Sequence, residues 1–92
     1  MLEQQGRLAE AEALYRVDLA VERKEGGDRA ENTLAALGNL AVNLREQGKL
    51  AEAEPLFREA VAARREVSGN DAQATMQTVG NLGKVLLAQG KL

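Results

Sequence analysis

The stretch Gly38-Asn-Leu-Ala-Val-Asn-Leu-Arg-Glu-Gln-Gly-Lys-Leu-Ala-Glu-Ala-Glu-Pro-Leu-Phe57 decides the fold, because parts of it occur more than once in the chain. Its segment Gly-Lys-Leu-Ala-Glu-Ala-Glu, at residues 48–54, is matched by Gly-Arg-Leu-Ala-Glu-Ala-Glu at residues 6–12. Gly-Lys-Leu returns at residues 90–92, so the period is 42 residues. A fixed period of roughly 20–50 residues is typical of repeat proteins, whose units stack because none can bury its apolar face alone.

Two repeat units follow from this period, at about residues 6–47 and 48–89, with remnants at residues 1–5 and 90–92. The two units share eighteen identical positions, which makes a chance similarity untenable. We therefore interpret residues 1–92 as a single repeat segment, and we expect it to be a fragment of a longer array.

The apolar spacing within the units predicts four helices, over about residues 8–25, 29–47, 50–67 and 72–89. Leu34, Leu37, Leu40, Ala41 and Leu44 are the expected core stripe of the second helix, and Met76, Val79, Leu82, Gly83 and Leu86 that of the fourth. Turns are expected at Gly6-Arg7, Gly26-Gly27, Gly48-Lys49, Ser68-Gly69-Asn70-Asp71 and Gly90. Asp28 and the Asn70-Asp71 pair are the expected caps of the helices that follow them.

Gly38 and Gly80 are unusual because they stand inside predicted helices at the same position of the two units. Glycine in a helix interior costs about 1 kcal/mol relative to alanine. Because this cost recurs at the same position of both units, it implies either that another backbone approaches the glycines closely or that the glycines leave room for something else.

Composition narrows the classes of function. Lysine and arginine (12 residues) are interleaved with aspartate and glutamate (14 residues), which argues against a nucleic-acid binder that relies on a basic face. No apolar run is long enough for a membrane span, and the start of the chain does not resemble a signal peptide. With no cysteine as well, we expect a cytoplasmic protein that contacts neither nucleic acid nor membrane.

The sequence contains none of the residue patterns that carry catalysis or cofactor binding. It has no histidine, no zinc-ligand spacing, no phosphate-cradling glycine loop and no nucleophile–base set. The carboxylates of the Ala-Glu-Ala-Glu segments are two residues apart, on different sides of a helix, and so cannot form a catalytic or metal pair. We expect no enzyme activity, no metal site and no cofactor.

The helix, glycine turn, helix pattern resembles the tetratricopeptide repeat, on the residues Leu37, Leu40, Ala41, Leu44, Gly48, Ala53, Phe57 and Ala60. The 42-residue period and the sequence motif N-L-A…G-K-L-A-E-A-E-P-L-F resemble the kinesin-light-chain type of that repeat. The resemblance implies an all-α fold, with antiparallel helix-turn-helix repeats in a right-handed α-solenoid. One departure is Asp18, which stands where Ala60 stands in the next unit.

In the resembled family, an asparagine at the position of Asn39 and Asn81 lines a concave groove that binds peptides. If the leucines point into the stack, the expected peptide-binding residues of this face are Asn39, Val42, Arg45, Gln77, Asn81 and Lys84. Asparagine suits a peptide backbone because it offers one acceptor and two donors. The alternative is that the two asparagines brace neighbouring helices. Arg45 and Lys84 could hold a carboxylate, or they could form an ordinary solvated face.

The resulting hypothesis is a protein–protein interaction scaffold that binds a peptide or partner domain in the concave groove. The alternative is a structural spacer or oligomerisation segment of a larger signalling or adaptor protein, with no ligand of its own. Both terminal helices carry leucine-rich stripes without a partner helix, so we also expect self-association, head to tail or by exchange of helices.

Overall fold

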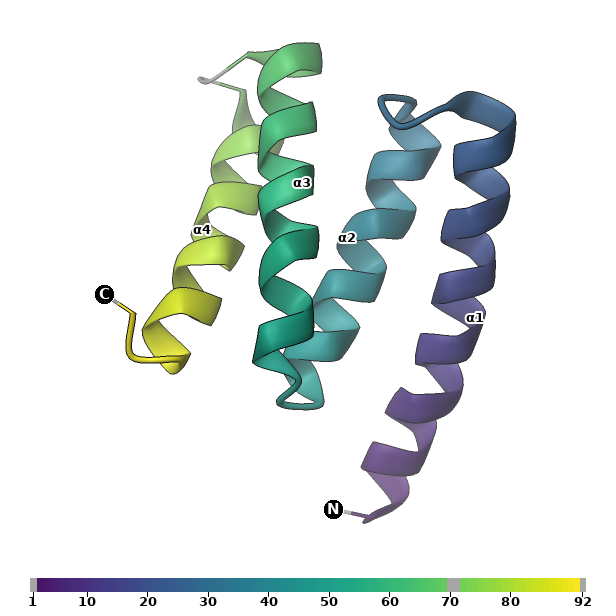
Figure 1. Ribbon diagram of the computed structural model, residues 1–92, viewed down its shortest axis with the longest axis vertical. Helices are drawn as coiled ribbons and strands as arrows, with labels where there is room; N and C mark the ends of the chain where they lie inside the picture. Colours follow the sequence, from purple (N-terminus) through teal and green to yellow (C-terminus); the bar gives the residue numbers. More distant parts are fainter. Residues whose placement is uncertain (1, 70–71, 92) are drawn as a thin grey trace.

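The computed structural model describes residues 2–69 and 72–91 as four helices joined by short turns (Figure 1). They are α1 (Leu2–Gly26), α2 (Glu31–Glu46), α3 (Leu50–Ser68) and α4 (Gln73–Ala88). No strand is found among the residues that are described. The all-α prediction of a helical-repeat solenoid is therefore confirmed.

The helices form a curved, two-layered stack in which each helix packs against the next one along the chain (Figure 1). The molecule is only 18 Å thick along its shortest axis, which is the depth of two helix layers of about 10 Å each. Cα atoms of α2 and α4 come within 8 Å of each other, whereas those of α1 and α3 do not. The layer formed by α2 and α4 is therefore the inner, concave side of the stack.

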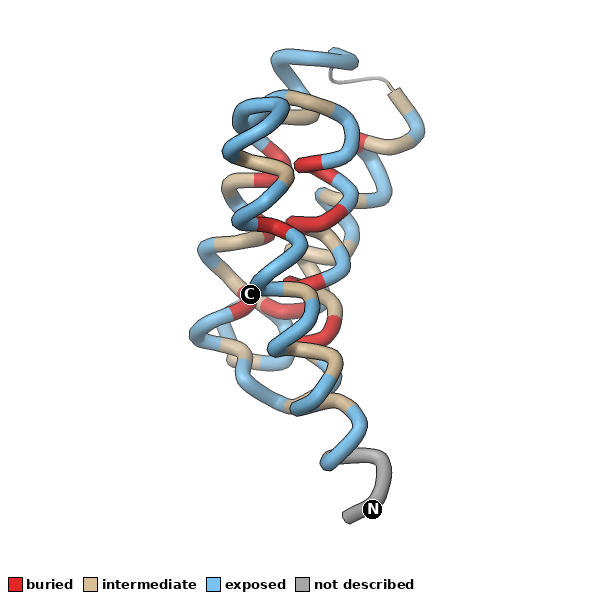
Figure 2. The backbone as a smooth tube through the Cα atoms, turned by 90° about the vertical axis from the view of Figure 1, so that its right-hand side faces the viewer, coloured by how far each residue is buried: buried red, intermediate tan, exposed pale blue. Residues whose placement is uncertain are grey.

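The core is the region where α2 is enclosed by its neighbours on both sides. Its predicted stripe is fully confirmed, since Leu34, Leu37, Leu40, Ala41 and Leu44 are each no more than 2% exposed. From α3, Ala53, Phe57, Ala60 and Val61 complete this core. Figure 2 shows the buried positions in the interior between the helices, with exposed turns of helix around them.

Two glycine turns repeat with the same geometry at the carboxyl ends of α2 and α4. Gly48 and Gly90 have φ of 81° and 73°, a left-handed conformation that glycine adopts without strain. The amides of Gly48 and Lys49 bond to the carbonyls of Arg45 and Leu44, which closes the end of α2. This tight closure brings α3 back antiparallel to α2.

The predicted turn at Gly6-Arg7 is wrong, because α1 runs without interruption from Leu2 to Gly26. Gly6 has no left-handed φ, unlike its counterparts Gly48 and Gly90. Glycine permits a turn but does not enforce one. The helix therefore continues, gaining one hydrogen bond for each added residue.

The predicted cap at Asp28 is also wrong. The residue at the cap position of α2 is Ala30, and that of α4 is Ala72; neither makes a side-chain capping hydrogen bond. Both have extended backbone. Their carbonyls accept the first hydrogen bonds of the helices, from the amides of Leu34 and Met76. Asn70 and Asp71, the other predicted cap, lie outside the described residues, as does Leu92.

The predicted core stripe of α4 is only partly buried. Met76 and Val79 are 63% and 40% exposed, although their counterparts in α2 are enclosed. The side of α4 that is buried carries Thr75 and Val85, because only α3 covers this helix, whereas α2 is covered by both α1 and α3.

A matched pair of glycine substitutions tests the continuous α1 helix. A Cβ added at Gly26 would lie 2.8 Å from the Cβ of Ala30, whereas one at Gly6 meets nothing within 4 Å. We expect Gly26→Ala to lower the free energy of unfolding by about 1–3 kcal/mol through overpacking. Gly6→Ala should leave it unchanged or raise it by up to about 1 kcal/mol, because alanine is the better helix former. Urea titrations followed by circular dichroism measure both changes. If Gly6→Ala lowered the free energy of unfolding, the prediction of a turn at Gly6 would be supported instead of the continuous helix.

Candidate functional site

The six residues predicted for the groove lie on the two neighbouring helices of the inner layer. α2 carries Asn39, Val42 and Arg45, and α4 carries Gln77, Asn81 and Lys84. Asn39, Gln77 and Lys84 are exposed, while Val42, Arg45 and Asn81 are half-buried. Of these six, the structure joins one pair by a hydrogen bond, Arg45 and Asn81.

Arg45 connects the two helices of the inner layer. Its Nη1 donates to Oδ1 of Asn81 at 3.1 Å, and its guanidinium carbon lies 6.0 Å from the ring centre of Phe57 in α3. A cation at this distance from an aromatic face is attracted by the ring quadrupole. This geometry favours the bracing interpretation for Asn81, and it leaves Arg45 already engaged rather than free for a carboxylate.

Asn39 has different surroundings from Asn81, because it borders an open depression between α1 and α2. The depression has a volume of about 190 Å³ and is lined by Leu8, Ala11, Tyr15, Asn39, Val42, Asn43 and Glu46. Sites for drug-sized ligands occupy roughly 300–1,000 Å³, so this one suits a single side chain. At the equivalent place beside Asn81, the aromatic ring of Phe57 lies beneath the guanidinium of Arg45.

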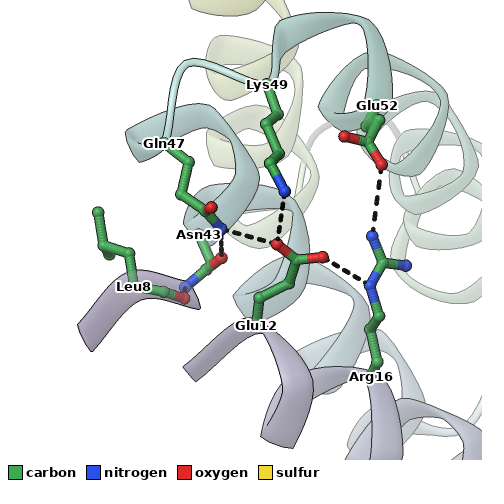
Figure 3. Close-up of polar contacts among 7 residues, drawn as sticks. All are labelled: Leu8, Glu12, Arg16, Asn43, Gln47, Lys49 and Glu52. Carbon is green, nitrogen blue, oxygen red and sulfur yellow. Dashed lines mark hydrogen bonds and ion pairs between the residues drawn. The ribbon is translucent and has the colours of Figure 1, made fainter. Parts of the chain in front are cut away.

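Asn43, which has Val85 as its counterpart in the second unit, has a structural role. It is 4% exposed, and its Nδ2 donates to the carbonyl of Leu8 in α1 at 3.0 Å (Figure 3). In the second unit, Gln89 takes over by donating to the corresponding carbonyl of Leu50 at 3.2 Å. The same carbonyl is thus satisfied in both units by side chains from different positions.

Glu12 forms a polar clamp that joins α1 to the turn between α2 and α3 (Figure 3). Its carboxylate accepts hydrogen bonds from Gln47 at 2.9 Å, Arg16 at 2.8 Å and Lys49 at 3.1 Å. These donors, Gln47 foremost, lower the pKa of Glu12 from 4.5 to about 2. The ionised form is therefore the one that holds the two elements together.

Glu54 repeats this clamp one unit later. It accepts from Lys91 at 2.8 Å and Arg58 at 2.9 Å, and these donors lower its pKa to about 2. Neither clamp is among the sequence predictions, because the Ala-Glu-Ala-Glu carboxylates were weighed only as pairs with each other. The available signal was that the donors also recur at 42 residues, as Arg16/Arg58, Gln47/Gln89 and Lys49/Lys91.

Gly38 and Gly80 are free of close neighbours. A Cβ added at either position would meet no heavy atom within 4 Å, apart from the helix's own backbone. The expectation that another backbone approaches these glycines closely is therefore wrong. The other alternative, room kept for something outside the fold, is the one that remains.

Among the described residues, no group of three or more acidic, histidine or cysteine side chains is placed to hold a metal ion. None of the described helices is both long and apolar enough to cross a membrane.

The family model described as "Tetratricopeptide repeat" matches the chain twice, over residues 1–66 and over residues 35–92. A search of curated proteins finds no match to the chain.

The two clamps predict a specific pH dependence of stability. Glu12 and Glu54 bind protons more weakly in the folded chain than in the unfolded one, because their pKa values fall from 4.5 to about 2. Their contribution is therefore fully present above pH 4.5 and is lost as the pH falls toward 2. We expect Glu12→Gln/Glu54→Gln to lower the unfolding free energy at pH 7 and to have little effect near pH 2.

The matched control is Glu10→Gln, because Glu10 is exposed and takes part in no ion pair described by the structure. Urea unfolding at pH 7, 4 and 2.5 measures all three chains. If the Glu10 variant and the clamp variant had the same pH profile, the clamps would not be the source of the effect.

Proposed function

This chain belongs to the tetratricopeptide repeat family, and from that premise we propose that it is a scaffold holding a peptide or partner domain against the inner face of α2 and α4. Repeats of this family generally mediate protein–protein interactions, and the family is typically a non-enzymatic scaffold. The kinesin-light-chain type of repeat, indicated by the 42-residue period, is part of the same proposal.

The observation that carries the proposal is the pair of open glycines, Gly38 and Gly80. Each lowers the stability of its helix by about 1 kcal/mol relative to alanine. Among the residues that the structure describes, no heavy atom outside the helix's own backbone lies within 4 Å of a Cβ built at either glycine. An external backbone that lies close against α2 and α4 would explain both glycines at once.

The residues beside these glycines suit an extended peptide. The exposed amide of Asn39 can donate to and accept from a peptide backbone, whatever side chains the peptide carries. The depression next to it offers the ring of Tyr15 and the side chain of Val42 to one apolar residue of that peptide. On α4, Gln77 and Lys84 continue the polar surface and are free to contact the same ligand.

Binding measurements on two glycine variants test this proposal. Peptides selected for the immobilised chain from a displayed library would serve as probes, with affinities measured by isothermal titration calorimetry. We expect Gly38→Ala/Gly80→Ala to raise the unfolding free energy by about 1–2 kcal/mol, because two helix-interior glycines are removed. The same variant should weaken peptide binding by about tenfold or more, because the new methyl groups obstruct the backbone.

Gly83→Ala is the matched control, since it also adds a methyl group to α4 where nothing lies within 4 Å. It is the counterpart of the core residue Ala41, so it should stabilise the helix without affecting binding. A second variant, Asn39→Ala, should reduce binding with an unchanged melting temperature, because Asn39 is exposed. If the glycine pair and the Gly83 control bound the peptides equally well, the groove would not be the binding site.

A second candidate function is a structural one, in which the segment joins others of its kind and has no ligand of its own. The observation in its favour is that large apolar side chains are uncovered at both ends of the stack. These are Leu14, Val17 and Val21 on α1, and Met76 and Val79 on α4, all 40–71% exposed. Unpartnered apolar surface of this kind promotes association between protein molecules.

Sedimentation of the chain over a range of concentrations tests this second candidate. We expect its mass to rise with concentration, and Leu14→Glu to reduce the rise because a charge would have to be buried in the contact. Val42→Glu is the control, because it places the same charge on the inner face. A compact monomer at high micromolar concentration would exclude self-association as a function of the segment.

A further inference from the structure

The outer layer of the stack differs from the inner layer in how its helices meet. In the inner layer, Cα atoms of α2 and α4 approach within 8 Å of each other. Among the described residues, no Cα atom of α1 comes that close to one of α3, although both helices pack against α2 (Figure 1). The outer layer is therefore split lengthwise between α1 and α3, and α2 is the element that joins its two halves.

A depression of about 320 Å³ marks this split. It is bordered by all three helices, and its lining residues are Arg16, Leu19, Ala20, Arg23, Leu40 and Leu56. Leu40 of α2 is only 1% exposed, so the depression lies directly above the core. At this point open space, and not a layer of packed side chains, separates the two outer helices.

Three arginine–glutamate pairs bridge the split. Each arginine comes from α1 or from the loop that follows it, and each glutamate comes from α3. The pairs are Arg16 with Glu52 at 3.6 Å, Arg23 with Glu59 at 2.7 Å, and Arg29 with Glu66. The three glutamates are spaced by seven residues, which is close to two helical turns, so they form one row along α3.

Two of the arginines are also held by a carboxylate on their own side of the split. Nε of Arg16 lies 2.8 Å from Glu12, and its Nη2 reaches across to α3 (Figure 3). Nη1 of Arg23 lies 3.9 Å from Asp28, and its Nη2 makes the bridge. Because the guanidinium is planar and rigid, anchoring one nitrogen fixes the direction in which the others point.

These bridges are suited to control shape more than stability. All six side chains are 35–65% exposed, and exposed ion pairs contribute little to stability. The angle between α1 and α3 is different, because no close approach of their backbones fixes it. Attraction across the split draws the two helices together on the convex side, and so opposes a sharper bend of the stack.

We propose that the three pairs form a salt-sensitive latch that limits how far the stack bends about α2. When the charges are screened, α1 and α3 move apart on the outer side and the curvature increases. The Debye length falls from about 30 Å at 0.01 M salt to about 3 Å at 1 M, so the latch is strongest at low ionic strength. It needs only α1, α2, α3 and the loop between α1 and α2, and it is independent of what the inner face binds.

The distance between spin labels on α1 and α3 tests the latch. Glu25 and Val67 are exposed and stand at the same position of these two helices, 42 residues apart. The chain has no cysteine, so Glu25→Cys/Val67→Cys takes a label only at these two positions. We expect pulsed electron paramagnetic resonance to give a longer and broader distance distribution when salt is raised from about 0.01 M to about 1 M.

Charge reversal at the shortest bridge gives the decisive comparison. In the labelled chain at low salt, Arg23→Glu and Glu59→Arg should each lengthen the distance, because attraction across the split becomes repulsion. Arg23→Glu/Glu59→Arg should restore the short distance and its response to salt, since the pair forms again with its ends exchanged. A role of these side chains in packing alone would not be rescued by exchanging them.

Arg65→Glu is the matched control, because Arg65 is the counterpart of Arg23, is exposed, and takes part in no ion pair among the described residues. It should leave the label distance unchanged, and circular dichroism checks that every variant keeps its helix content. A distance that responds neither to salt nor to the single reversals would overturn the proposal. So would a double reversal that stays long, or a control that lengthens the distance as much as Arg23→Glu does.

Discussion

The structure depends on the enclosure of α2 between α1 and α3. An amphipathic helix is stable in water only when its apolar stripe is covered, and α2 has apolar side chains facing both neighbours. Phe57 from α3 and Leu19 from α1 complete that core from opposite sides. Helices α1 and α4 each have one such neighbour, which is why their remaining apolar residues face solvent.

The 42-residue period predicted the fold well because the same residues recur where the same contacts recur. Leucines in α2 and the glycine at residue 48 could be assigned from spacing alone. Features that depend on which helices pack against a residue could not be assigned from spacing. Gly6 and Gly48 stand at equivalent positions, yet Gly48 has a left-handed φ and turns the chain, whereas Gly6 lies inside the continuous helix α1. The sequence predicts Met76 as a core residue because it is the counterpart of Leu34. In the structure Leu34 is buried and Met76 is exposed.

The candidate site illustrates the same limit at the scale of a single side chain. Asn39 and Asn81 each follow a glycine and precede a leucine, and spacing places both on the inner face. Arg45 then makes them different, since it bonds to Asn81 and lies over Phe57, while Asn39 keeps an open depression beside Tyr15. The clamps of Glu12 and Glu54 differ from this. Their hydrogen-bond donors recur at 42 residues in the sequence, but only the contacts in the structure show that these donors bind the two carboxylates.

The order of helix contacts along the chain has a consequence for how the molecule folds. Every extensive contact joins a helix to the next one in sequence, so the mean sequence separation of contacts is small. Proteins of such low contact order fold rapidly, and a linear array of neighbours can start at any adjacent pair. In the reverse direction, the terminal helices have the fewest contacts and should open first. Amide protons in the middle of α2 would then be the last in the chain to exchange with solvent.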